Sequence, residues 1–155
     1  FVGEGHLRPH LEREAGRFGI ADRVTFAGAT AAQPLIDLYR ACDCVASPSR
    51  ADPFGIVALS AWAARKPVLA TLAGAPSEFV KHEDAGMLVD LTPGAVAAGL
   101  RQLLSDFDRL RWMGENGRTA LETAFTWDVV AQQTLAAYER SVRFVKTPSL
   151  NGDRT

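Results

Sequence analysis

Residues 47–61, with the sequence SPSRADPFGIVALSA, decide the fold of this chain. The apolar residues 43–46 precede them and are predicted to form a β-strand. Small and polar residues follow as far as Gly55, and an apolar helix is predicted to begin near Ile56. The first turn of a helix carries unpaired N–H groups and a partial positive charge, which together bind anions. Because such turns lie at the carboxyl ends of strands in parallel α/β sheets, this stretch predicts a site for a phosphorylated ligand.

Strand and helix patterns alternate on both sides of this stretch. The expected strands are residues 1–3, 23–26, 43–46, 67–71 and 86–89. The expected helices are residues 7–18, 33–41, 56–65, a short one capped by Ser77, and then 92–105, 106–123 and 127–144. This alternation predicts an α/β fold, with a parallel sheet covered by helices on both faces and extra helices at the C-terminal end. The continuously apolar residues 67–71 are typical of a central strand.

Composition limits the classes of function. The net charge of −1 gives no reason to expect a nucleic-acid partner. Cys42 and Cys44 stand too close together for an ordinary disulfide loop and have no histidine cluster beside them, so we expect reduced thiols and a cytoplasmic protein. No apolar run is long enough to span a membrane, and peripheral association with one is left open. The chain opens on what looks like the end of a strand, so we expect a fragment.

Seven short segments then occur in an order that is typical of one protein family. They are VGEG (2–5), ADRVTFAG (21–28), LYRACDCVAS (38–47), PSRADPFGIVALSAWAARKPVLAT (48–71), GAPSEFV (74–80), AGMLVD (85–90) and FTWDVVAQQ (125–133). Together they resemble the C-terminal, donor-binding domain of GT-B fold glycosyltransferases of family 4, also called group 1. The resemblance implies a Rossmann-like domain at residues 1–145, truncated at its N-terminus. Residues 146–155 are polar and contain Pro, Gly and Asn, so we expect a disordered tail there.

The same resemblance implies a retaining sugar transfer from a nucleotide-diphosphate sugar, UDP- or GDP-linked, to an unidentified acceptor. It implies no cofactor, and no Asp-x-Asp motif calls for a metal ion. In this family the acceptor site lies in a separate N-terminal GT-B domain, which we expect to be missing here together with a basic pair that neutralises the diphosphate. The chain alone is therefore expected to be inactive, and the full-length protein to be the enzyme.

The family signature holds two acidic residues eight positions apart, and Asp52 and Ser60 stand at these positions. The resemblance implies that Asp52 contacts the donor sugar, as the catalytic residue, and that Ser60 faces the ribose. A serine lacks the charged acceptor, which weakens donor binding by about tenfold to a hundredfold. The residues expected to bind the donor or its phosphates are Gly3, Gly28, Ser47, Phe54, Gly55, Ile56, Val57, Ser60 and Glu78.

Plainer interpretations stand beside these. Asp52 could instead cap the helix that follows it, although the motif around it favours the sugar contact. Ser60 is equally suited to close helix packing. Glu78 is favourable in the first turn of a helix in any case. Arg8 stands where a dinucleotide fingerprint needs its third glycine, so NAD is not expected. The three tryptophans are expected in the core or against another domain. Two alternative functions stay open. One is a degenerate, non-catalytic GT-B domain that serves as a binding or scaffold module, and the other is another GT-B enzyme, such as a sugar-nucleotide epimerase.

Overall fold

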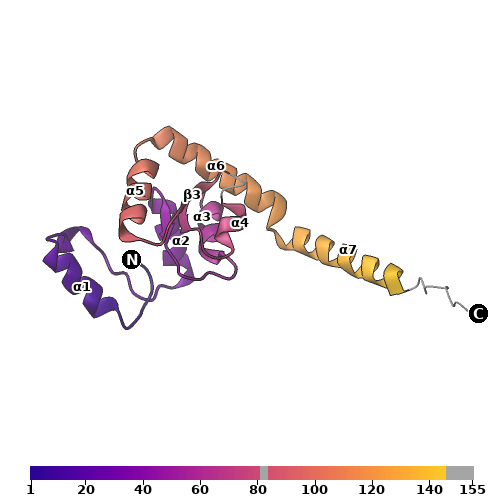
Figure 1. The fold of residues 1–155 in the computed structure, drawn as a ribbon, viewed down its shortest axis with the longest axis horizontal. Helices are drawn as coiled ribbons and strands as arrows, with labels where there is room; N and C mark the ends of the chain where they lie inside the picture. The colour runs from indigo at the N-terminus through magenta and orange to yellow at the C-terminus, as the bar shows by residue number, and fades with distance from the viewer. Residues whose placement is uncertain (81–83, 146–155) are drawn as a thin grey trace, which may run out of the picture. The chain divides into compact units, whose positions relative to one another are not determined.

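The computed structural model describes residues 1–80 and 84–145, and these residues adopt an α/β fold (Figure 1). They divide into two compact units, one spanning Phe1–Cys42 and a second that begins at Asp43. The predicted tail at residues 146–155 lies outside the described residues. Each unit is described by itself below.

The first unit contains two helices and a single β-bridge. Its elements are α1 (Arg8–Arg17), the 3₁₀ turn η1 (Ala21–Arg23) and α2 (Ala32–Ala41). The strand expected at residues 23–26 is wrong, because the amides of Arg23 and Val24 donate to the carbonyls of a local turn instead of a neighbouring strand. The N-terminal residues still bond to this segment: the Phe1 ammonium donates to the Thr25 carbonyl (2.6 Å) and the Ala27 amide to the Phe1 carbonyl (2.8 Å). Val2 and Gly28 form the one parallel bridge. The expected strand at residues 1–3 is therefore reduced to that bridge.

The second unit is built on a parallel sheet, which in the described residues has three strands in place of the five expected for the whole chain. The strands are β1 (Val45–Ser47), β2 (Val68–Thr71) and β3 (Gly86–Val89), in that order across the sheet. The register pairs Val45 with Val68, and Val68 with Gly86. All four residues of β2 are buried, which confirms the prediction of a central strand covered on both faces.

Helices cover both faces of this sheet (Figure 1). Those packed against its strands are α3 (Ile56–Ala63), α4 (Pro76–Phe79), α5 (Pro93–Leu103) and α6 (Phe107–Ala124). The last helix, α7 (Trp127–Val145), contacts α6. The side chain of Leu69 in β2 joins a buried cluster with Leu103, Leu110 and Met113, which belong to α5 and α6. The next strand residues point to the opposite face, where α3 and α4 pack against β2.

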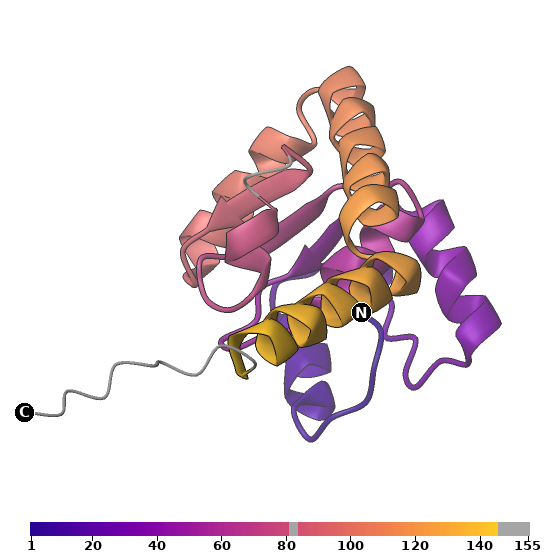
Figure 2. The ribbon, with the colours of Figure 1, turned by 90° about the vertical axis from the view of Figure 1, so that its right-hand side faces the viewer.

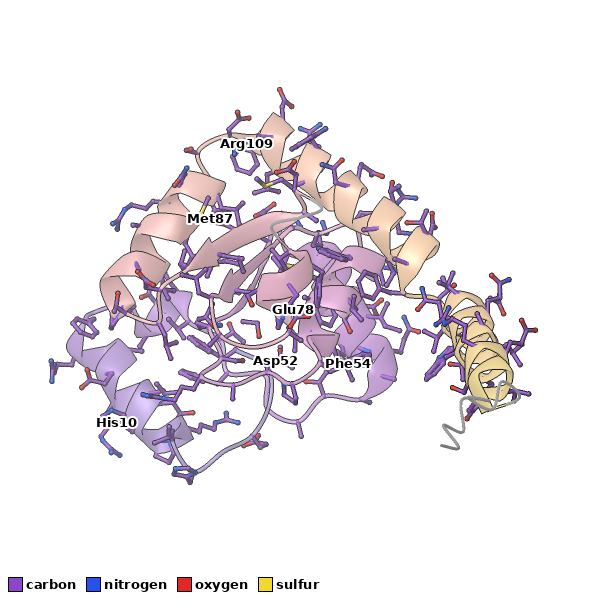
Figure 3. All side chains as sticks on the ribbon, turned by 45° about the vertical axis from the view of Figure 1, so that its right-hand side comes forward. His10, Asp52, Phe54, Glu78, Met87 and Arg109 are labelled. Carbon is purple, nitrogen blue, oxygen red and sulfur yellow. The ribbon has the colours of Figure 1, made fainter. Side chains whose placement is uncertain are left out.

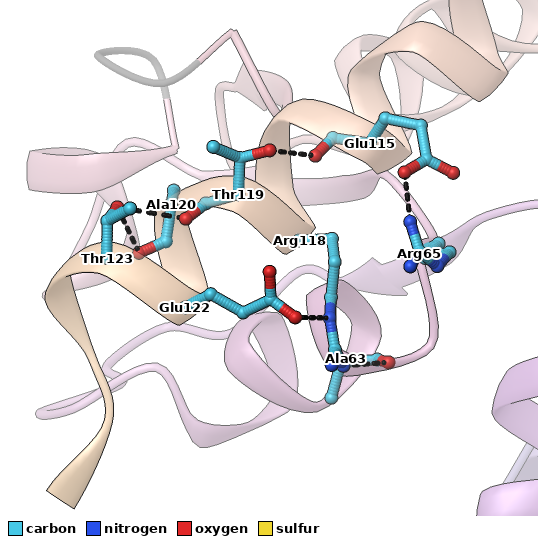
Figure 4. A network of polar contacts seen from close by, with 8 residues as sticks. All are labelled: Ala63, Arg65, Glu115, Arg118, Thr119, Ala120, Glu122 and Thr123. Atoms are coloured by element: carbon cyan, nitrogen blue, oxygen red, sulfur yellow. Dashed lines mark hydrogen bonds and ion pairs between the residues drawn. The ribbon is translucent and has the colours of Figure 1, made fainter. Parts of the chain in front are cut away.

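The helices α3 and α6 pack closely through Trp62, which is completely buried. Its indole N–H donates to the carbonyl oxygen of Ala85 at 3.0 Å. Figure 4 shows the polar contacts between the two helices. Arg118 donates to the carbonyl of Ala63 at the end of α3 (2.9 Å) and to Glu122 (2.7 Å), and Arg65 pairs with Glu115. These contacts join the C-terminal end of α3 to the middle of α6.

The chain changes direction between α6 and α7, as Figure 2 shows. This confirms the break predicted near residues 125–126. Phe125 turns inward, 6.1 Å from the Trp62 ring and 5.3 Å from the Phe79 ring, and the Thr126 hydroxyl accepts from the Val129 amide at 3.4 Å. The helix can therefore end at an aromatic anchor and restart at a capping residue.

The three tryptophans have different environments. Trp62 confirms the prediction of a core position. Trp112 and Trp127 are 52% and 87% exposed, so a core assignment is wrong for both, and packing against another domain stays a prediction. Both lie on helix faces that the described residues leave uncovered, which helical spacing alone does not reveal. No helix in the described ranges has the length and apolar content needed to cross a membrane.

Candidate functional site

Two loops meet at the carboxyl end of the sheet in the second unit. One follows β1 (residues 48–55) and the other follows β2 (residues 72–75). The amide of Ala75 donates to the carbonyl of Asp52 at 2.8 Å, and the hydroxyl of Thr71 donates to the carbonyl of Ser49 at 2.7 Å. β1 and β2 are neighbouring parallel strands, so their loops share the edge at which α/β proteins bind ligands.

Asp52 shapes the turn that enters α3. Its Oδ1 atom accepts from the amide of Gly55 at 2.7 Å and from the amide of Phe54 at 3.3 Å. The side chain is half-buried, and a carboxylate is favourable beside the positive end of a helix. The plainer expectation, that Asp52 caps the following helix, is wrong, because the N-cap of α3 is Gly55 and no side chain caps this helix. Asp52 instead holds the turn that precedes it. The expected contact with a sugar remains a prediction.

The N-terminus of α3 offers unpaired amides. The first backbone bond of the helix runs from the Leu59 amide to the Gly55 carbonyl, so the amides of Ile56, Val57 and Ala58 have no helical carbonyl to donate to. Ile56 is exposed and Val57 half-buried. The amide of Gly55, which was expected to bind the ligand, instead donates to Asp52 in this structure.

Gly55 itself is required by the turn. Its φ of +81° is in the left-handed region, and a β-carbon there would lie 2.7 Å from Cζ of Phe79. Phe79 stacks edge-on against Trp62, with 5.3 Å between the ring centroids. The N-terminus of α3 is thus fixed against α4 by a glycine on one side and an aromatic core beneath it.

The remaining predicted residues of this unit lie on the same elements. Ser60 is half-buried in α3, one turn after Ile56 and on the same face of the helix. Ser47 ends β1, with its hydroxyl 3.4 Å from that of Ser49. Figure 3 labels Asp52 and Phe54, from the loop before α3, together with Glu78 of α4. Both Phe54 and Glu78 are exposed.

The predicted residues Gly3 and Gly28 belong to the first unit. The Gly3 amide donates to the Gly28 carbonyl at 2.8 Å. Gly28 is buried, and a β-carbon there would lie 2.6 Å from the Glu4 carboxylate. The Arg8 side chain also lies beside Gly28, and it donates hydrogen bonds of 2.9 Å to both Glu4 and Glu12. The Glu12 hydrogen bond, followed by the charges of Glu4 and Glu12, raises the pKa of the Arg8 guanidinium.

Sequence reasoning missed two residues that organise the loops, Thr71 and Gly74. Gly74 has a φ of +86°, and a β-carbon there would lie 2.5 Å from the Asp52 carbonyl oxygen. The expectation that Ser77 caps α4 is wrong, since α4 begins at Pro76 and the Ser77 hydroxyl donates back to the Gly74 carbonyl at 2.7 Å. The sequence signals that could have pointed to them are a polar residue, Thr71, at the end of an apolar strand, and a glycine, Gly74, in the loop that follows.

A parallel sheet whose loops present helix amides at its carboxyl edge defines an α/β ligand-binding domain. Residues 1–120 match the family model described as glycosyl transferases group 1, and the chain belongs to that family. It is 34% identical to an uncharacterized glycosyltransferase of Methanocaldococcus jannaschii, over 89% of this chain and 36% of that protein. It is 40% identical to D-inositol 3-phosphate glycosyltransferase of Salinispora tropica, over 90% of this chain and 29% of that protein.

Solved structures agree with the assignment to this family. Sucrose-phosphate synthase from Thermosynechococcus elongatus superposes with a TM-score of 0.78 at 31% identity, over 92% of this chain and 36% of that one. Anabaena HepE in complex with UDP superposes with a TM-score of 0.77 at 28% identity, over 90% and 40%. These neighbours are GT-B glycosyltransferases, which confirms the predicted fold class. The chain spans about a third of the length of the curated relatives it matches.

Proposed function

We propose that this chain is the donor-binding domain of a retaining glycosyltransferase that transfers a sugar from a nucleotide-diphosphate sugar to an acceptor. The observation that supports this most is the pair of amides at Ile56 and Val57, which have no helical carbonyl to donate to and lie at the carboxyl edge of the sheet in a group 1 family member. The HepE neighbours are in complex with UDP, with UDP and glucose, and with UDP-glucose. These complexes favour UDP as the nucleotide.

The proposed chemistry follows from charge. Breaking the bond between the sugar and the diphosphate puts negative charge on the leaving phosphate oxygens. Amides fixed at a helix N-terminus stabilise that charge without having to reorganise during the reaction. In this proposal Ile56 and Val57 supply such amides to the diphosphate, and no metal ion or cofactor takes part.

Asp52 can hold the turn before α3 and contact a ligand at the same time. The hydrogen bonds that this carboxylate accepts from the described residues all end on Oδ1. In our proposal Oδ1 holds the turn and Oδ2 accepts a hydroxyl of the donor sugar. Ser60 binds the ribose through one hydroxyl group, and this weakens donor binding relative to an acidic residue by about tenfold to a hundredfold.

Transfer in this proposal also needs residues outside this chain. The acceptor site and the basic pair for the diphosphate are assigned to a further GT-B domain and to an upstream loop, so the 155 residues alone are expected to be inactive. We place the protein in the cytoplasm, with peripheral membrane association left open.

Calorimetric titration of the intact gene product with UDP-, GDP- and ADP-glucose tests the proposal. We expect micromolar binding of one of them, and loss of that binding in Asp52→Ala. The control is Asp106→Ala, because Asp106 caps α6 through the amides of Asp108 (3.1 Å) and Arg109 (3.0 Å) and lies in no candidate site. Each change removes a carboxylate that accepts two backbone amides and lowers stability by about 1 kcal/mol, but only Asp52→Ala should abolish binding. Failure of the intact protein to bind any nucleotide sugar would refute the proposal.

A second candidate is a non-catalytic GT-B domain, which the serine at position 60 favours. Ser60→Glu separates the two candidates. An enzyme with a weakened ribose site should bind the nucleotide more tightly after this change, whereas a domain that has lost its donor site should show no binding before or after it.

A further inference from the structure

We propose that Thr71 is a positioning residue, whose hydroxyl ties the loop after β1 to the loop after β2 and so sets where Asp52 and the N-terminus of α3 stand. Thr71 is the last residue of β2. Its Oγ1 lies 2.7 Å from the carbonyl oxygen of Ser49 and 3.5 Å from that of Ala73. The effect on donor binding rests on the proposed function, while the effect on the loops does not.

The burial of Thr71 is the first argument. It is 2% exposed, and within the described ranges it is the one polar side chain that is fully buried. It follows Val68, Leu69 and Ala70, all of them apolar and buried. A valine has the same shape and would suit such a position without a buried hydroxyl to satisfy. The hydroxyl is therefore explained by its hydrogen bond and not by the packing.

The second argument is the point at which the backbone pairing between β1 and β2 ends. β1 pairs with β2 only as far as Ser47 opposite Ala70. The next residue, Thr71, pairs on its other side, with Val89 of β3. Beyond Ser47 the ladder gives no further backbone bond from β2 to the loop after β1. The hydroxyl of Thr71 makes the next connection, one residue further along β2.

Further contacts carry this connection to α3. The Ala75 amide donates to the Asp52 carbonyl at 2.8 Å, and Gly74 packs directly on the Asp52 backbone. The Asp52 side chain then accepts from the amide of Gly55, the N-cap of α3. The loop is therefore held at Ser49 by Thr71 and at Asp52 by the next loop, with two residues between the two anchors.

Thr71→Val removes the hydroxyl and keeps the shape, leaving the Ser49 carbonyl without its donor. We expect faster hydrogen exchange at residues 49–55 and at the Ala75 amide, with unchanged protection in β2. The affinity of the intact gene product for UDP-glucose should fall about three- to tenfold, the usual effect of one lost hydrogen bond. This loss should appear in KM with kcat nearly unchanged, whereas a merely structural loss would reduce the active fraction and hence kcat.

Thr71→Ser and Thr123→Val complete the experiment. Thr71→Ser keeps the hydroxyl and should restore both the exchange rates and the affinity. Thr123→Val removes an exposed hydroxyl of α6, which donates to the carbonyl of Thr119, and should change neither. If Thr71→Val fails to fold, Thr71→Cys, whose thiol is a weak donor, replaces it.

Unchanged exchange at residues 49–55 in Thr71→Val would overturn the proposal, and so would a Thr71→Ser variant that behaves like the valine. If the unaltered protein does not bind UDP-glucose, the proposed function fails, and the exchange rates alone decide the role of Thr71.

Discussion

Gly74 shows how closely the two loops of the candidate site approach each other. Its φ is +86°, and a β-carbon at this position would lie only 2.5 Å from the Asp52 carbonyl oxygen, which leaves no room for a side chain. We expect Gly74→Ala to lower the free energy of unfolding by roughly 1–3 kcal/mol, because it combines a strained backbone with a backbone clash. Urea unfolding measures this. Gly94→Ala in α5, where a β-carbon meets nothing within 4 Å, is the control and should not destabilise the protein.

At the scale of residues, the sequence placed Asp52, Gly55 and Ser60 correctly in the loop and helix that now carry them. It could not place Thr71, because a hydrogen bond from a side chain to a distant carbonyl leaves no periodic pattern in the sequence. It also could not tell that the Gly55 amide donates to Asp52, since that depends on the rotamer of one side chain.

At the scale of elements, Gly117 lets α6 lie against α3. A β-carbon at this position would collide with the indole ring of Trp62, which is fully buried and bonded to the Ala85 carbonyl. Alanine normally stabilises a helix relative to glycine by about 1 kcal/mol. Here we expect Gly117→Ala to destabilise the protein by roughly 1–3 kcal/mol, because overpacking outweighs propensity. Thermal unfolding followed by tryptophan fluorescence measures it, and a rise in Tm would contradict the packing described.

The contacts of Arg118 predict unequal effects for the two partners in its ion pair. Glu122→Ala removes an exposed ion pair and should change stability by less than about 0.5 kcal/mol. Arg118→Met also removes the bond to the Ala63 carbonyl at the C-terminal end of α3, so we expect it to cost about 1 kcal/mol. Chemical denaturation of both variants checks this order. Equal effects would mean that the bond to Ala63 contributes nothing.

The elements of the second unit were predictable because their patterns are strong. The apolar run of β2, the helix expected from residue 92 and the break at residues 125–126 are all confirmed. Thr92 caps this helix, α5, by accepting from the Ala95 amide. The strand expected at residues 23–26 does not form. β-Branched residues favour an extended backbone, but a strand also needs a partner strand to pair with, and the sequence does not show whether one is there. For Trp127, the spacing of apolar residues predicted the helix correctly, but it did not show which face of that helix is buried.

At the scale of the whole molecule, this chain supplies one candidate ligand site, at the carboxyl edge of its sheet. The described residues hold no group of three or more metal-ligating side chains. Since the chain spans about a third of the length of its curated relatives, transfer itself is expected only from the intact gene product.

The most direct test measures where a nucleotide contacts the protein. Hydrogen exchange of the intact gene product with and without UDP reports on residues 56–58, the first turn of α3. We predict that UDP slows exchange at these amides and at residues 52–55, while exchange in α7 stays unchanged. Binding of UDP without any protection at residues 56–58 would contradict the assignment of the α3 N-terminus as the diphosphate site.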